Sequence, residues 1–109
     1  MSTIFSVSEQ SHTHFLGTRY SGRQLRAPLE DILSKSDNIA IDFSGIHVTQ
    51  SFIDELIGTL ILKYGPDLLT HLSFKGCSED VKAIINFVVT TRINDYNQNK
   101  IDNNASNSH

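Results

Sequence analysis

Apolar residues recur at helical spacing in three stretches of the chain, and short apolar runs stand before and between them. The clearest helical stretch runs from Phe52 to Tyr64, where the apolar positions fall on one face of a helix. Ser51 precedes it as a suitable N-cap, with Asp54 three residues later as in a short capping box. Gly65 and Pro66 are expected to end the helix. The stripe that we expect to be buried is Phe52, Ile53, Leu56, Ile57, Leu60, Ile61 and Tyr64.

The first predicted helix begins at Ser21, which is followed by Gln24 at capping-box spacing. Pro28 lies within its apolar pattern, lacks an N–H group and clashes with the carbonyl of the preceding turn. The sequence therefore predicts either a kink at Pro28 or a helix that begins near Ala27, with the proline in its first turn. The apolar positions of this helix are Leu25, Leu29, Ile32 and Leu33.

The last predicted helix follows Ser78, a suitable N-cap, has two acidic residues in its first turn and should end near Arg92. Its apolar stripe is Val81, Ile84, Ile85, Val88 and Val89. From residue 94 onward nearly all residues are Asn, Asp, Gln or Ser, which cannot bury enough apolar surface to offset the entropy of ordering. We therefore expect one domain over residues 1–93 and a disordered polar tail over residues 94–109.

Four apolar runs have the length of β-strands. The most continuous, Asn38 to Phe43, predicts a central strand that is covered on both faces. His71 to Phe74 predicts the next strand, which should be parallel to it because a helix stands between them. Ile4 to Val7 and the weaker run His14 to Arg19 predict an N-terminal hairpin. The fold expected from this order is a small α/β domain, with a mixed, mostly parallel sheet and about three helices packed on it.

The sequence Asp-Phe-Ser-Gly-Ile at residues 42–46, followed by Ser-Phe-Ile-Asp-Glu-Leu at residues 51–56, resembles a family of STAS-like domains with no assigned function. More distantly it is similar to STAS domains, the anti-sigma-factor antagonists of bacterial partner switches. The resemblance covers about Phe15 to Arg92. It implies a non-catalytic regulatory module that binds a protein partner, such as a histidine-kinase-like ATPase acting as an anti-sigma factor. STAS domains usually carry a further C-terminal strand and helix, so we expect one sheet edge to stay open here.

By this resemblance, Ser51 falls where the antagonists carry the serine that their partner kinase phosphorylates. Its neighbours depart from that pattern, because Gln50 stands where Asp is usual and two bulky residues follow where small ones are usual. N-capping is by itself a sufficient reason for a serine, so both interpretations of Ser51 stay open. The expected partner surface is the loop of residues 46–50 with the first turn of the helix. Its residues are His47, Thr49, Gln50, Ser51, Asp54 and Glu55.

Charged residues near these helices allow a second function. Asp54 and Glu55 are adjacent, so they point about 100° apart and are expected to be surface acids that complement the helix dipole. Arg19, Gly22 and Arg23 stand near the start of the first helix, where arginines and free N–H groups can bind an anion or a nucleotide phosphate. A solvated basic face explains the same arginines. The alternative function is therefore a small-molecule or nucleotide-binding domain.

Composition narrows these possibilities. With 109 residues the chain makes one small domain, and its net charge of −3 argues against a nucleic-acid-binding surface. The single cysteine, Cys77, excludes an internal disulfide. No third group orients His47 toward Ser51, and His12 and His14 lack further metal ligands at recognisable spacing, so we expect no enzyme, metal or cofactor. Neither a signal peptide nor a membrane-spanning segment is apparent, and the expected location is the cytoplasm.

Overall fold

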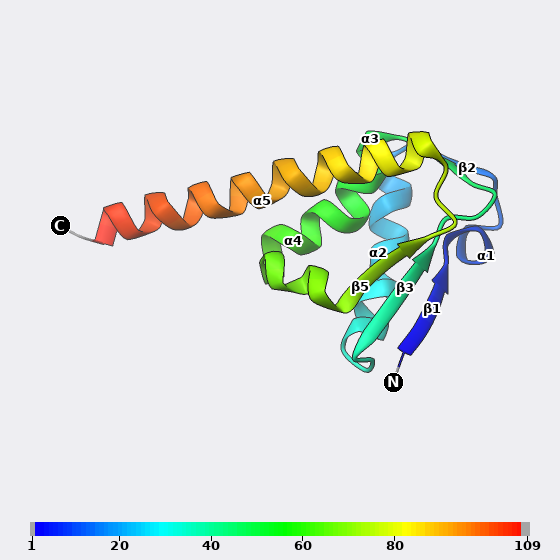
Figure 1. The fold of residues 1–109 in the computed structure, drawn as a ribbon, viewed down its shortest axis with the longest axis horizontal. Helices are drawn as coiled ribbons and strands as arrows, with labels where there is room; N and C mark the ends of the chain where they lie inside the picture. Colours follow the sequence, from blue (N-terminus) through cyan, green and yellow to red (C-terminus); the bar gives the residue numbers. More distant parts are fainter. Residues whose placement is uncertain (1, 108–109) are drawn as a thin grey trace.

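The computed structural model describes the backbone of residues 2–107 and the side chains of residues 2–99. Three parallel strands form the main sheet in the order β1–β3–β5, and two very short parallel strands form a second sheet (Figure 1). The main strands are β1 (Ser2–Ser6), β3 (Asn38–Asp42) and β5 (Leu72–Lys75). The short strands are β2 (Phe15–Leu16) and β4 (His47–Val48). The predicted α/β class, the parallel pairing and the central position of β3 are confirmed.

The predicted N-terminal hairpin is wrong. β1 pairs in parallel with β3, with Phe5 opposite Ile41, and β2 pairs with β4 in the other sheet. The segment after β1 does not reverse the chain, because it forms the short helix α1 (Val7–Ser11), capped by the Ser6 side chain. The chain then returns through a long helix, which places the next strand of the main sheet parallel to β1.

Three long helical segments pack against the main sheet. The first is α2 (Arg19–Leu33) and the last is α5 (Glu79–Asn107). The middle segment is continuous from residue 50 to residue 64 and consists of α3 (Gln50–Ile53), a π-type turn η1 (Asp54–Gly58) and α4 (Thr59–Tyr64). A 3₁₀ turn, η2 (Pro66–His71), connects it to β5. The expected number of main helices is thus confirmed.

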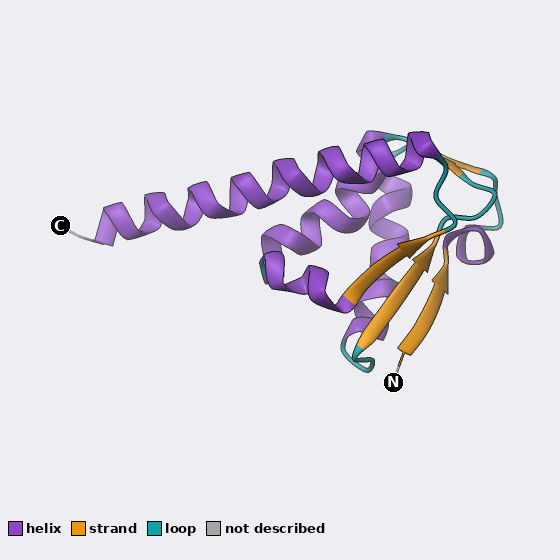
Figure 2. Ribbon diagram, viewed as in Figure 1, coloured by secondary structure: helices purple, strands orange, loops and turns teal. Residues whose placement is uncertain are grey.

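The helices lie on one face of the main sheet (Figure 2). Phe5, Ile39 and Ile41 point to this face and are buried, whereas Ile4, which alternates with them, is exposed on the opposite face. The prediction that the central strand is covered on both faces is therefore wrong. The alternation of buried and less buried residues along β3 is the pattern of a sheet that is packed on one side only.

The middle helical segment supplies much of the core. The six residues of its predicted stripe before Tyr64 are fully buried, as predicted, and form doublets that recur every four residues, whereas Leu62 is half-buried. An α-helix has 3.6 residues per turn, so such a repeat drifts by about 40° each time. The π-type turn is wider and offsets that drift, which keeps the doublets on one face. Tyr64, in contrast, is exposed at the end of α4.

Helix α2 begins earlier than the sequence predicted. Its N-cap is Thr18, whose hydroxyl accepts a hydrogen bond from the backbone N–H of Ser21 at 3.0 Å. Ser21 therefore lies within the first turn and is not the cap. Pro28 stands inside the helix, so the alternative start near Ala27 is also wrong. The apolar stripe of α2 packs on the sheet and outweighs the cost of the proline.

Helix α5 begins as predicted, with the Ser78 side chain accepting a hydrogen bond from the backbone N–H of Val81 at 3.2 Å. It does not end near Arg92 but continues to Asn107, so the predicted domain boundary after residue 93 falls inside a helix. Arg92 still contacts the middle helical segment, and the ring of Tyr96 lies beside Gly65, which follows that segment. Beyond them a helix satisfies its own backbone hydrogen bonds, so polar residues can continue it into solvent. Residues 108 and 109 of the predicted tail lie outside the described residues.

Although α5 is long, it is too polar to span a bilayer, and the same limit of length or polarity applies to every other helix in the described part of the chain.

Candidate functional site

The predicted partner-binding residues lie at the carboxyl end of the main sheet, where β2, β4 and the first turn of α3 come together (Figure 1). In the β2–β4 ladder Phe15 is opposite His47, and Leu16 is opposite Val48. Leu16 and Val48 are buried, which leaves Phe15 and His47 on the outer side. Gln50 is also exposed. Open parallel sheets commonly place binding sites at this end.

The N-cap of helix α3 is Thr49. Its hydroxyl accepts a hydrogen bond from the backbone N–H of Phe52 at 3.2 Å and donates one to the carbonyl of Gly17 at 2.9 Å. Ser51 is the second residue of the helix and is half-buried, so its prediction as the N-cap is wrong. Both residues satisfy the local cap rule, and the contact with Gly17, 32 residues away, favours Thr49.

We expect Thr49→Ala to lower the free energy of unfolding by about 1–2 kcal/mol, because the cap is lost and the Gly17 carbonyl loses a donor. Ser51→Ala should change it by less than about 0.5 kcal/mol, since Ser51 does not cap the helix. Urea unfolding of both variants measures the difference. Equal losses in the two variants would show that Thr49 has no special role.

Asp54 is not a surface acid as predicted, because its side chain is 11% exposed and lies between three helical segments. Arg92 of α5 donates two hydrogen bonds to this carboxylate, from Nε to Oδ1 at 2.6 Å and from Nη2 to Oδ2 at 2.5 Å. Arg19 of α2 donates a third hydrogen bond, from Nη1 to Oδ2 at 2.8 Å. The two hydrogen bonds from Arg92, with the one from Arg19, outweigh burial and lower the pKa of Asp54. The carboxylate is a structural link between α2, η1 and α5.

Glu55 is not the solvent-exposed acid that the sequence predicted either, because its side chain is largely buried against arginines. Arg26 Nη1 donates to Glu55 Oε2 at 2.9 Å and to the Glu55 backbone carbonyl at 2.7 Å. Arg19 lies 3.6 Å from the other carboxylate oxygen, and Arg23 approaches only to 4.0 Å. The adjacent acids thus bind different arginines and share one, Arg19. Together these ion pairs fix the start of α2 against η1.

The predicted anion-binding residues come together, but their charges are balanced. The guanidinium groups of Arg19 and Arg23 face Asp54 and Glu55. A Cβ on Gly22 would lie 2.6 Å from the Cβ of Glu55, so this glycine allows the two helices to approach closely. An anion at this place would have to compete with both carboxylates, and anion binding stays a prediction.

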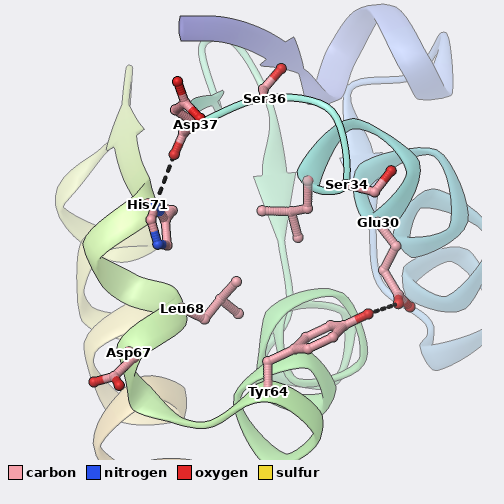
Figure 3. Close-up of a pocket in the computed structure, with 9 residues that line it drawn as sticks. Glu30, Ser34, Ser36, Asp37, Tyr64, Asp67, Leu68 and His71 are labelled. Carbon is pink, nitrogen blue, oxygen red and sulfur yellow. Dashed lines mark hydrogen bonds between the residues drawn. The ribbon is translucent and has the colours of Figure 1, made fainter. Parts of the chain in front are cut away.

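A surface cavity of about 460 Å³ lies at the opposite end of the sheet, between α2, α4 and η2. Figure 3 shows Tyr64 pointing at Glu30, with a 2.8 Å hydrogen bond, and His71 bound to the backbone carbonyl of Asp37 at 2.8 Å. The cavity is lined by Glu30, Leu33, Ser34, Ser36, Asp37, Tyr64, Asp67, Leu68 and His71. Three of these residues are acidic and none is lysine or arginine, so the cavity does not suit a nucleotide phosphate.

The structure gives little support for a reactive cysteine or for a metal site built on histidines. Cys77 precedes α5, but burial raises the pKa of its thiol, so the helix N-terminus does not activate it. His12 and His14 are exposed, and in the described residues no three His, Cys, Asp or Glu side chains are placed to hold a metal ion.

Comparison with protein families gives a match over residues 21–82 to a family described as a STAS-like domain of unknown function. The matched segment begins in the first turn of α2, contains β3, the middle helical segment and β5, and ends in the first turn of α5. Comparisons with curated proteins and with solved structures gave no significant match. The match includes Ser51, Asp54 and Glu55, but β1 and β2 precede it. On the strength of this match across more than half of its length, the chain belongs to the family of STAS-like domains of unknown function.

Proposed function

We propose that this chain is a non-catalytic interaction module that binds a protein partner at the start of α3, in a switch like that of anti-sigma-factor antagonists. The observation that carries the proposal is the position of Ser51, half-buried in the first turn of α3 and next to exposed Gln50. His47 is exposed in the preceding strand. A partner could contact these three residues without any rearrangement of the core.

Phosphorylation of Ser51 would suit this position. The first turn of a helix presents backbone N–H groups and the positive end of the dipole, both of which favour a phosphate. From the sequence, Asp54 and Glu55 should repel such a group. In the fold their charges are offset by Arg19, Arg26 and Arg92, which reduces that repulsion.

The test uses two variants of Ser51 and the partner recovered by pull-down from the native host. Ser51→Ala should bind the partner like the parent, whereas Ser51→Asp should weaken binding at least about tenfold, or 1.4 kcal/mol, because it mimics the phosphorylated state. Calorimetric titration measures both affinities, and circular dichroism checks that both variants fold. If both variants bind like the parent, the phosphorylation switch should be abandoned.

The alternative function, anion or nucleotide binding by Arg19, Gly22 and Arg23, has weaker support. Two of these positions already serve the contact between α2 and η1. Titration with ATP and with inorganic phosphate separates this function from the first, because a protein-interaction module should release no heat with either.

A further inference from the structure

We infer that exposed side chains on β2 and at the start of α2 form the anchor of the partner-binding surface, and that the partner segment bound there carries an apolar side chain flanked by carboxylates. We call Phe15, Arg19, Tyr20 and Arg23 the aromatic–arginine patch. The inference rests on the proposed function, since it adds residues to the same surface and states the chemistry of the partner.

The composition of the patch is that of an interface anchor. Phe15 is 60% exposed and Tyr20 is 64% exposed, although both are large aromatic residues. The side chains of Arg19 and Arg23 are 51% and 60% exposed. Single exposed aromatic residues are common on soluble proteins, but here two of them and two exposed arginines lie within residues 15–23. Tyr and Arg are among the residue types that carry most binding energy at interfaces, and Phe is enriched there.

The patch is continuous with the start of α3. The ring of Phe15 lies over Gly17, where a Cβ would be 2.8 Å from two ring carbons and 3.4 Å from Thr49 Cγ2. The Gly17 carbonyl accepts the hydrogen bond from the Thr49 hydroxyl, and Phe15 is the strand partner of His47. A partner that covers His47 would therefore also meet the Phe15 ring.

A groove of about 420 Å³ runs beside the patch, between α1, β2 and α2. Phe15 lines it from β2 and Gln24 lines it from α2. Gln24 Nε2 donates a 2.8 Å hydrogen bond to the Tyr20 hydroxyl, so this hydroxyl lies next to a residue that lines the groove. The lining of the groove is mostly polar, and Leu25 and Pro28 add a small apolar part that a side chain of the partner can contact.

The outward charge of the patch is positive, although the chain carries a net charge of −3. The acids that face the two arginines, Asp54 and Glu55, are only 11% and 17% exposed, so the guanidinium groups are the charges that solvent and a partner meet. Glu9 of α1 is also an exposed acid, and α1 contributes residues to the same groove. Arg23 is 4.0 Å from Glu55, the weakest of these contacts, and can bind a partner carboxylate in its place.

A peptide selection tests the inference. A phage-displayed library of random 12-residue peptides is selected on the immobilised full chain, and the enriched sequence is synthesised for fluorescence anisotropy. We expect an aromatic or aliphatic residue flanked by Asp or Glu. Phe15→Ser and Arg23→Glu should each weaken binding of this peptide at least tenfold. Phe87→Ser and Lys82→Glu are the matched controls, because both residues are exposed on α5, and they should leave binding unchanged.

Several outcomes would overturn the inference: no enriched peptide, enriched peptides without acidic residues, or equal effects of the patch variants and the controls. The native partner separates this inference from the proposed function. If it responds to Ser51→Asp but not to Phe15→Ser or Arg23→Glu, the switch stands and the patch is rejected. If it responds only to the patch variants, the patch stands and the switch is rejected.

Discussion

Asp54→Asn should lower the melting temperature by about 10–20 °C, which corresponds to about 2–3 kcal/mol in a domain of this size. The variant removes the charge that faces Arg92 and Arg19 while both arginines remain. Asp31→Asn is the matched control, because Asp31 near the end of α2 forms an exposed ion pair with Lys35 in the turn that follows, and its loss should change stability by less than about 0.5 kcal/mol. Thermal unfolding followed by circular dichroism measures both.

The pH dependence of the stability of Asp54→Asn tests whether the lost charge is the cause of the destabilisation. The pKa of Asp54 is lowered in the folded state by Arg92 and Arg19, so its contribution is present above the pKa of the unfolded chain and is lost as the pH falls through the folded value. The stability difference between the parent and Asp54→Asn should be full at pH 7 and shrink below about pH 4. A difference that stays constant down to pH 2 would show that charge is not its source.

The second large effect is expected from Gly22→Val, which should destabilise the fold by about 3 kcal/mol. A Cβ at this position would lie 2.6 Å from Glu55 Cβ and 2.7 Å from the backbone carbonyl oxygen of Phe52. The carbonyl belongs to a packed helix and cannot move aside, so α2 must separate from α3. Ala27→Val makes the same kind of change at an exposed position of α2 and should cost less than about 1 kcal/mol.

Urea unfolding of the two variants gives the comparison. Equal midpoints for Gly22→Val and Ala27→Val would mean that the close approach of the two helices contributes nothing to stability. The result bears on the site as well, because the same contact positions Arg19 and Arg26 against the two carboxylates.

The spacing of apolar residues correctly predicted the helices and strands that depend on local sequence alone. The apolar run at Ile39 and Ile41 identified the central strand, and the doublets of the middle helical segment identified its buried face. Their strict repeat of four residues is also a signal for the π-type turn, because an α-helix alone would rotate the later doublets away from the core. That signal stood in the sequence and was missed.

The features of the site that the sequence did not predict depend on contacts between residues far apart in the chain. Asp54 and Arg92 are 38 residues apart, so no local rule distinguishes this buried ion pair from a surface acid at a helix start. The choice of Thr49 over Ser51 as the cap depends on Gly17 in the same way. Phe15 was absent from the predicted site because only the β2–β4 pairing brings it beside His47.

The π-type turn also determines where related chains can differ in length. Eight residues separate Phe52 from Leu60, and the wider turn lets them span the two turns that about seven residues make in an α-helix. A family member one residue shorter within residues 54–58 would replace this turn by an ordinary one and keep both buried faces in place. A deletion within α4 would instead turn the residues after it by about 100°. Insertions and deletions in this segment should therefore gather at the π-type turn.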